Sequence, residues 1–408
     1  MSPDRTDALL GPAPAEPFFD QMVDLRRSVH RHPELAFAEH RTTGLIRDQM
    51  AALGATEAMA LGETGGIWTM DGGQPGRPVV LRADIDALPV QEDPGRAVHS
   101  EVEGVMHACG HDVHVGALLG AAAVLAARRE DLPGRYVFVF QPAEEALCGA
   151  KSMIEAGALR LMEGASLVGF HVTSLMPTGY VALRPGVAMS EAHSVVVDLN
   201  GPGGHAAMPD ARGDVIRAAA ELVGRLAEVV DGLSYEGTTC VCSAGTMQAG
   251  TAVNVVPTAA RVTGTLRTFT DAQRREAIGR LGDLCAAIGD ERGVQVAFDL
   301  PEHTPAVLND PAVSAVVRAE ASVVAGDEHV LRLPPMAPSD DVSEFLAHVP
   351  GCYFFVGGGS ADRSSGAHHS PAFSVEDGAL GVGAAVLARS AVALGAPAGA
   401  RTPGGPAR

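Results

Sequence analysis

The sequence has few cationic side chains. Its 408 residues include 30 lysines and arginines against 49 aspartates and glutamates, which gives a formal net charge of −19 at pH 7. Nucleic acids and anionic membranes bind basic surfaces, so we expect neither as a partner. Lys151 is the only lysine, and its neighbours Gly149, Ala150 and Ser152 give no sign of Schiff-base chemistry.

The sequence also lacks long apolar runs and a disulfide pattern. No N-terminal apolar segment is present, and no run approaches the 18 residues that suggest a membrane span. Six cysteines in a chain of this length do not resemble a disulfide framework. We therefore predict a cytoplasmic, reducing location. Residues 1–16 and 396–408 are rich in alanine, proline and glycine and are predicted to be disordered tails.

The chain is long enough for two domains, because single hydrophobic cores rarely exceed about 250–300 residues. Short apolar runs at 78–83, 136–140 and 166–170 read as buried strands, and a helix is predicted over 115–129. This alternation is typical of an α/β fold. From residue 186 the pattern changes to alternating strands and two helices. We predict a catalytic domain at 17–185 and 301–395, interrupted by a smaller α+β domain at 186–300.

Met106–His114 is the most informative segment. It holds one thiol, three imidazoles and one carboxylate, and such ligands suit zinc or a similar divalent transition metal. Cys109 and His111 do not share a helix face, and Gly110 between them predicts a tight loop. The alternative is a buried cysteine beside surface histidines. The roles of Asp112 and His114 stay open.

Further candidate ligands follow other predicted strands. Glu145, His171 and His369 join Cys109 and His111 in a set of five, one more than a closed tetrahedral zinc site needs. Such a surplus fits two metals sharing a bridge, or one metal with an open position. Open α/β sheets bind ligands where strands end, which favours the metal interpretation.

Carboxylates beside these ligands have predicted roles. Consecutive side chains diverge, so Glu145 can bind metal while Glu144 faces a hydrolytic water as general base. The alternative, a solvated surface pair, is less consistent with the preceding apolar run. Asp84 and Asp86 follow a buried strand and could orient a metal-bound imidazole. Alternatively, they cap backbone amides in a turn.

The ordered motifs resemble those of the dinuclear metal amidohydrolases, which include hippurate hydrolase, N-acyl-amino-acid aminoacylases and plant indole-acetyl-amino-acid hydrolases. The resemblance covers about residues 20–395, and its landmarks lie at 25–35, 82–89, 106–114, 141–145, 203–209 and 254–257. It implies a metallo-exopeptidase-like catalytic domain with a mixed sheet flanked by helices. The inserted domain is then a lid and dimerisation module.

The resemblance also implies site residues. It implies two divalent ions (Zn, Mn, Co or Ni) on Cys109, His111, Glu145, His171 and His369, with Glu144 as general base. His205 of the inserted domain would reach the site of the partner subunit in a homodimer and polarise the scissile carbonyl. Asn254 and Arg267 match positions near the substrate carboxylate.

We interpret the chain as a metal-dependent hydrolase of the amide bond in small N-acyl amino acids. Two alternatives remain open. One is a hydrolase of small dipeptides or aminobenzoyl-amino acids, and the other is a catalytically silent binder of amino-acid conjugates. The family's Ser-Glu-Asp-Phe-Ser stretch reads Ser-Asp-Asp-Val-Ser at 339–343 here. The acyl-group preference of relatives therefore does not transfer directly.

Overall fold

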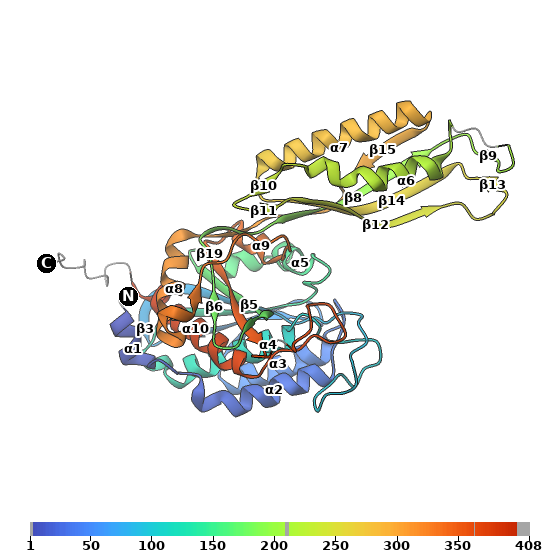
Figure 1. Cartoon of the computed structure of the whole chain (residues 1–408). Helices are drawn as coiled ribbons and strands as arrows, with labels where there is room; N and C mark the ends of the chain where they lie inside the picture. The colour runs from blue at the N-terminus through green and yellow to red at the C-terminus, as the bar shows by residue number, and fades with distance from the viewer. Residues whose placement is uncertain (1–2, 209–211, 363, 398–408) are drawn as a thin grey trace. The chain divides into compact units, whose positions relative to one another are not determined.

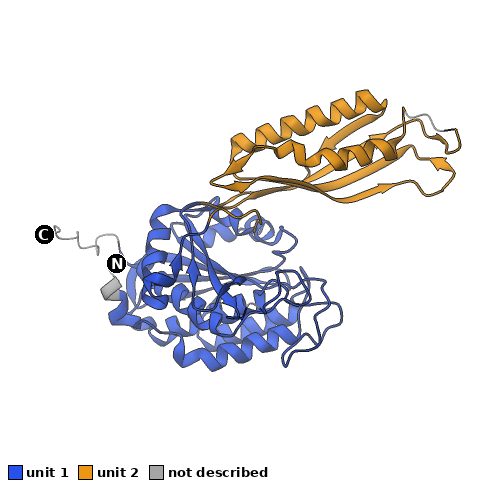
Figure 2. Cartoon of the chain, viewed as in Figure 1, with its two compact units in different colours: residues 1–186, 308–333, 341–408 blue, residues 187–307, 334–340 orange. Residues whose placement is uncertain are grey.

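The computed structural model describes residues 3–208, 212–362 and 364–397. Contacts divide the chain into two compact units (Figure 2). Unit 1 comprises residues 1–186, 308–333 and 341–408, and unit 2 comprises residues 187–307 and 334–340. The sequence predicted an inserted domain at 186–300, with the two catalytic segments before and after it. Unit 2 instead extends to residue 307 and also includes residues 334–340. No periodic pattern in the sequence indicates that this second segment joins unit 2.

Unit 1 is built on an eight-stranded mixed sheet (Figure 1). Its strand order is β1 (Thr56–Ala60), β2 (Gly66–Asp71), β4 (Pro133–Gln141), β3 (Gln74–Asp84), β5 (Ser166–Pro177), β19 (Gly351–Gly359), β6 (Val181–Ala182) and β18 (Val330–Leu331). Four central strands run parallel to one another, namely β4, β3, β5 and β19. Strand β2 is antiparallel to β4, and β1 is antiparallel to β2. The predicted α/β class with a mixed sheet is confirmed.

Helices cover this sheet and bury its central strands. Val79, Val80 and Leu81 of β3 are fully buried, as expected for an apolar run in a parallel sheet covered by helices. The helices of unit 1 are α1 (Pro3–Leu10), α2 (Phe19–Arg31), α3 (His40–Ala52), α4 (His111–Ala127), α5 (Gly149–Glu155), α8 (Pro311–Ala325), α9 (Val342–Leu346) and α10 (Gly378–Gly395). Helices α4 and α10 pack against each other and against β3.

Helix α10 is long and apolar enough to cross a membrane by length and composition alone. However, 78% of it is buried within the protein. It also carries a fully buried arginine, Arg389, whose guanidinium binds Asp7 at 2.6 Å and Glu320 at 2.8 Å. These contacts identify α10 as a core helix of unit 1.

The N-terminal segment differs from the predicted tail. Residues Pro3–Leu10 form α1, and Arg389 donates to the Asp7 carboxylate and to the backbone carbonyl of Gly11. A buried guanidinium needs hydrogen-bond acceptors, and the N-terminal segment supplies two of them to Arg389. The local composition of residues 1–16 could not predict this contact, because Arg389 is distant in the sequence. In the predicted C-terminal tail, residues 398–408 lie outside the described residues.

Unit 2 is an antiparallel sheet with two helices. Strands β12 (Val241–Ala249), β14 (Ala259–Thr268), β8 (Glu191–Asn200) and β15 (Gln295–Asp299) are adjacent in that order, and β16 (His303–Thr304) also pairs with β8. Helices α6 (Val215–Arg225) and α7 (Asp271–Arg292) share its apolar core. Asp214 caps α6, and Gly293 ends α7 in the left-handed conformation at φ 67°. Two short pairs also belong to this unit, β9 (Gly204–His205) with β13 (Val255–Val256) and β10 (Ser234–Tyr235) with β11 (Thr238–Thr239). Strand β7 (Gly186–Met189) pairs with β17 (Val307–Asn309).

Candidate metal centre

The carboxyl ends of three adjacent strands bring the candidate residues together. Asp84 ends β3, the Glu144–Glu145 pair follows β4, and His171 lies within β5. Because these strands are parallel neighbours, their carboxyl ends meet at one edge of the sheet. The proximity of residues distant in sequence therefore follows from strand order.

Gly110 places Cys109 and His111 at the start of α4. It adopts φ 91°, and a Cβ atom there would lie 2.4 Å from Val172 Cγ1. Both the conformation and the space require glycine. The predicted tight loop is present, but α4 begins at His111 rather than at Val115. A left-handed glycine before the helix allows this earlier start.

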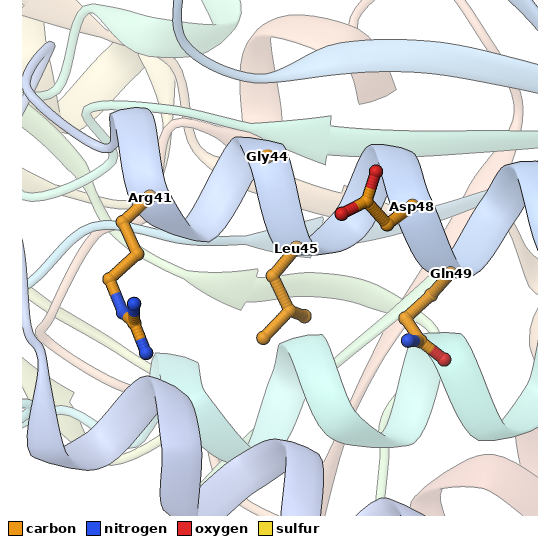
Figure 3. Close-up of a pocket in the computed structure, with 5 residues that line it drawn as sticks. All are labelled: Arg41, Gly44, Leu45, Asp48 and Gln49. Carbon is orange, nitrogen blue, oxygen red and sulfur yellow. The ribbon is translucent and has the colours of Figure 1, made fainter.

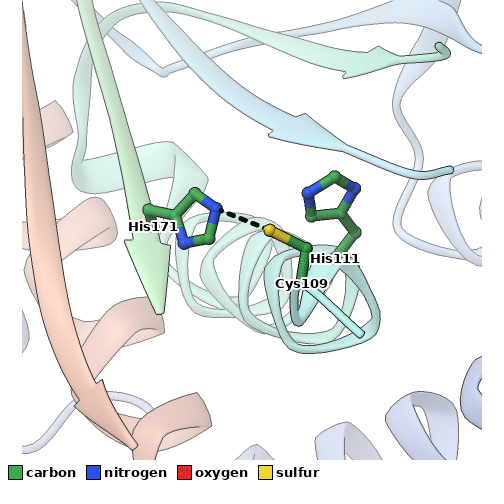
Figure 4. Close-up of side chains that lie close together, drawn as sticks. All are labelled: Cys109, His111 and His171. Carbon is green, nitrogen blue, oxygen red and sulfur yellow. Dashed lines mark hydrogen bonds between the residues drawn. The ribbon is translucent and has the colours of Figure 1, made fainter. Parts of the chain in front are cut away.

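Cys109 lies beside His171 and His111 (Figure 4). The distance from Cys109 Sγ to His171 Nε2 is 3.3 Å. His171 Nδ1 donates to the Val172 carbonyl at 2.6 Å, so Nε2 carries the lone pair that faces the sulfur. His111 Nδ1 likewise donates to the Asp86 carbonyl at 2.9 Å and leaves Nε2 as an acceptor.

Glu145 and His369 complete the predicted ligand set. His369 Nε2 lies 3.6 Å from Glu145 Oε2, and His111 Nε2 lies 3.8 Å from Glu145 Oε1. Ligand atoms of Cys109, Glu145 and His369 fall within 4.8 Å of one another, as do those of Cys109, His111 and His171. The structure thus brings all five candidate ligands into one cluster.

Two buried atoms of this cluster have no hydrogen-bond partner. They are His111 Nε2 and Glu145 Oε1, both acceptors that point into the cluster. A buried unsatisfied acceptor costs on the order of 1–3 kcal/mol. A cation between them would satisfy both atoms, and the sulfur, nitrogen and oxygen donors suit a borderline divalent ion.

The electrostatics of the cluster also fit a cation. Burial raises the pKa of Glu145 to about 7 and holds the pKa of the Cys109 thiol well above its usual value. Burial therefore disfavours the charged form of both groups in the metal-free chain. A bound divalent ion would supply positive charge and stabilise the carboxylate and the thiolate.

Asp86 orients two of the candidate ligands. Its Oδ1 lies 3.2 Å from His111 Nδ1, and its Oδ2 accepts the backbone N–H of Glu145 at 2.9 Å. Asp84 instead binds His114 Nδ1 at 2.5 Å and the Arg82 guanidinium at 2.6 Å. Asp86 thus has contacts suited to the predicted orienting role, whereas Asp84 is 3.7 Å from His111 Nδ1.

The contacts of His114 and Asp112 resolve what the sequence left open. His114 donates through Nδ1 to Asp84 and accepts the Val172 N–H through Nε2 at 2.9 Å, so neither nitrogen is available to a metal. Asp112 accepts from Arg26 Nε at 2.8 Å and His30 Nδ1 at 3.0 Å. Asp112 and His114 thus hydrogen-bond the Met106–His114 segment to α2, β3 and β5.

The Glu144 carboxylate is buried beside the cluster, with Oε2 3.9 Å from His111 Nε2. A second buried carboxylate, Glu39, fixes the segment that carries it. Glu39 Oε1 accepts the N–H of Ala143 at 2.9 Å, and Ala143 itself adopts φ 53°. Sequence reasoning missed Glu39, which directly precedes α3, lies far in sequence from every predicted ligand and therefore gave no local signal.

His368 was also missed. Its Nδ1 lies 3.8 Å from Cys109 Sγ, and burial lowers its pKa to about 4. The adjacent His368–His369 pair was a possible signal, but the sequence cannot tell which ring faces the cluster. In the structure both rings lie close to predicted ligands.

The remaining candidates lie on unit 2. His205 on β9 pairs with Val255 of β13, and the carbonyl of Asn254 accepts the N–H of Ala206. Arg267 on β14 donates to Ser339 Oγ at 2.7 Å and to the Ala337 carbonyl at 3.4 Å. Burial lowers the pKa of its guanidinium. In the part of the chain that the structure describes, Arg267 has only these neutral acceptors.

A separate hollow of about 380 Å³ runs along α3 (Figure 3). Its lining residues are Arg41, Gly44, Leu45, Asp48 and Gln49. None of the candidate ligands contributes to it, so it has no part in the metal centre.

Comparison with known proteins identifies a family. The sequence model of the peptidase family M20/M25/M40 matches residues 80–393. The N-acetylcysteine deacetylase of Bacillus subtilis is 32% identical over 92% of this chain and 97% of its own length. The IAA-amino acid hydrolase ILR1-like 2 of Arabidopsis thaliana is 34% identical over 92% of this chain and 85% of its own length. The crystal structure of the Bacillus subtilis YXEP protein, described as a dinuclear metal binding peptidase, superposes with a TM-score of 0.79 at 30% identity, covering 93% of this chain and 98% of that one.

Proposed function

Because the chain belongs to peptidase family M20/M25/M40, we propose that it is a metal-dependent hydrolase of the amide bond in N-acyl amino acids. One observation carries the proposal. The buried acceptors His111 Nε2 and Glu145 Oε1 have no partner and face each other across 3.8 Å, with the Glu144 carboxylate beside them. This arrangement suits metal-assisted hydrolysis with a carboxylate base.

Two divalent ions, of zinc, manganese, cobalt or nickel, would be held by the five candidate ligands: Cys109, His111, Glu145, His171 and His369. The surplus of ligands over one tetrahedral site supports two ions, as does the likeness to a protein described as dinuclear. When bound, such ions polarise an amide carbonyl and make water a nucleophile near neutral pH.

Glu144 is the proposed proton carrier. It would take a proton from the attacking water and pass it to the leaving nitrogen, since a positioned carboxylate can serve as base and then as acid. The backbone contact with Glu39 fixes the segment before it. His205 would donate to the developing oxyanion from the partner subunit of a homodimer.

Arg267 and Asn254 are the proposed recognition residues for the substrate carboxylate. The partly buried guanidinium of Arg267 hydrogen-bonds only to a hydroxyl and a carbonyl among the described residues. A buried cation without a counter-anion is costly, so a carboxylate ligand would be favourable there. This requirement matches the free carboxylate of an N-acyl amino acid.

Further observations support the choice of substrate, assembly and compartment. The names N-acetylcysteine deacetylase and IAA-amino acid hydrolase both refer to amino-acid conjugates. The edge strand β12 is mostly exposed and offers unpaired backbone to a second copy, which favours a homodimer. All six cysteines lie in the described ranges and are unpaired, consistent with a reducing, cytoplasmic location.

The test is turnover of a panel of N-acetyl and N-benzoyl amino acids, measured with added Mn²⁺, Co²⁺ or Zn²⁺. We expect Glu144→Gln to lower kcat by about 10²–10⁴-fold with metal content unchanged, because it removes only the proton carrier. Cys109→Ala should lower metal content, because it deletes a ligand. Glu163→Gln, which changes an exposed carboxylate, is the matched control.

The outcomes separate the alternatives. Turnover of Glu144→Gln within tenfold of the parent would remove the base assignment. Hydrolysis restricted to dipeptides or aminobenzoyl-amino acids would replace the proposed substrate class. Binding of N-acyl amino acids by the fully metallated protein without turnover of any substrate would identify a silent binder.

A further inference from the structure

A second cluster of metal-ligating side chains lies on unit 2. Strand register explains it: Glu191 and His193 are two residues apart in β8, so they share a face of the sheet. His303 of β16 is the direct antiparallel partner of His193. The two imidazole rings stack with centroids 4.4 Å apart and planes inclined by 14°.

The buried ring of this cluster has an unexplained polar atom. His193 is 7% exposed, and its Nε2 has no hydrogen-bond partner. The nearest carboxylate oxygen, Glu191 Oε2, is 4.0 Å away, beyond hydrogen-bond distance. His303 Nε2 lies 3.3 Å from that same oxygen. Ligand atoms of the three residues all fall within 4.8 Å of one another.

The Glu191 carboxylate is held in place by two donors. The Thr268 hydroxyl donates to Oε1, and Arg274 Nη1 donates to Oε2 at 2.7 Å. Arg274 also pairs with Asp271 at 2.9 Å. One guanidinium therefore serves two carboxylates, and the Glu191 carboxylate stays fixed beside the two imidazoles, where it can act as a ligand.

We propose that Glu191, His193 and His303 bind one divalent transition-metal ion of the zinc or nickel class, separate from the ions of the candidate catalytic centre. Two imidazoles and one carboxylate are the donors such borderline ions prefer. The His303 side chain is 42% exposed, so a water molecule would have room to complete the coordination. The two stacked rings are nearly parallel, so ion binding would require one of them to rotate, and His303 is the exposed one.

The ion has a structural consequence. Strand β16 has only two residues, so few backbone hydrogen bonds hold it to β8. An ion bound by ligands from both strands would link β16 to β8 at the paired positions 193 and 303. This ion contributes no group to the proposed hydrolysis, so the inference goes beyond that function.

The test is zinc stoichiometry of the full-length protein. Parent, His193→Gln, His303→Ala and the control His348→Ala, an exposed histidine on unit 1, are saturated with Zn²⁺, desalted and analysed for metal per chain. We expect about one zinc per chain fewer in His193→Gln and in His303→Ala than in the parent and His348→Ala. Loss of the catalytic ions would lower all four values equally, so this difference does not depend on the proposed hydrolase function.

Equal stoichiometry in the parent and the two cluster variants would overturn the proposal. If the buried substitution His193→Gln prevents folding, His303→Ala decides, because its side chain lies at the exposed rim. A zinc loss in His348→Ala as large as in His303→Ala would also overturn it, since binding would then be nonspecific to surface histidines.

Discussion

Replacing Gly149 by alanine should disturb the candidate base through one steric contact. A Cβ atom at Gly149 would lie 1.6 Å from the carbonyl oxygen of Pro142. Real Cβ contacts are essentially never under 3.0 Å, so the two segments must separate by at least 1.4 Å, the difference between these distances. Pro142 and Ala143 lead directly into Glu144, and the Ala143 carbonyl accepts the Gly149 N–H at 3.2 Å.

We expect Gly149→Ala to lower kcat by about 10²-fold, because a misplacement of about 1 Å at a reacting group costs roughly that factor. Overpacking should also lower the free energy of unfolding by about 1–3 kcal/mol. The assays are steady-state hydrolysis of an N-acyl amino acid at saturating metal, and urea unfolding under the same conditions.

The matched control is Gly44→Ala in α3, where an added Cβ meets nothing within 4 Å. It should leave kcat unchanged and raise the free energy of unfolding by about 0.5–1 kcal/mol, since alanine is the better helix former. A Gly149→Ala enzyme with parental kcat would contradict this prediction. It would mean that α5 moves away and that this contact does not set the position of Glu144.

Three other predictions test separate parts of the proposal. Arg267→Ala should raise KM for N-acyl amino acids far more than for their amides, because only the acids offer a carboxylate to the guanidinium; equal effects in steady-state assays would make Arg267 structural. Mixing Glu144→Gln chains with His205→Ala chains should restore activity in about a quarter of sites. Half of randomly paired dimers are mixed, and in each of these one site carries both substitutions and the other carries neither. No recovery of activity despite verified subunit exchange would reject the role of His205 in the partner subunit's site. Since burial raises the pKa of Glu145 to about 7 in the metal-free chain, apparent metal affinity should fall more steeply with decreasing pH below that value than above it, by up to about tenfold more per pH unit, because protons then compete for the carboxylate as well as for the Cys109 thiol; calorimetric titrations giving the same pH slope of the affinity on both sides of pH 7 would contradict Glu145 as a ligand.

Local sequence was sufficient for the central strands of unit 1 and for the donor chemistry. Apolar runs located β3, β4 and β5, because strands buried on both faces are continuous stretches of apolar residues. Gly110 between Cys109 and His111 marked the turn before α4, since only glycine fits there. These signals lie within a few residues of the features that they predict, so one sequence contains them.

Roles that depend on both ring nitrogens of a histidine needed the tertiary structure. The sequence left the role of His114 open, and the structure shows that Asp84 and the Val172 N–H occupy its two nitrogens. Glu39 gave no signal because its partner, the Ala143 N–H, is 104 residues away. Hydrogen bonds over such separations depend on which strands and helices become neighbours.

The sulfur, nitrogen and oxygen donors and their positions after strands can be found in the sequence alone. Which of these donors meet at one point in space depends on the tertiary structure. Glu191 and His303 belong to one cluster because β16 pairs with β8 at one register, although the two residues are 112 positions apart in the sequence. A shift of that register by one residue would turn His303 to the opposite face of the sheet. Strand order likewise brings His171 close to Cys109. The order of the strands depends on how the whole apolar core is buried, and no single segment of the sequence contains that information.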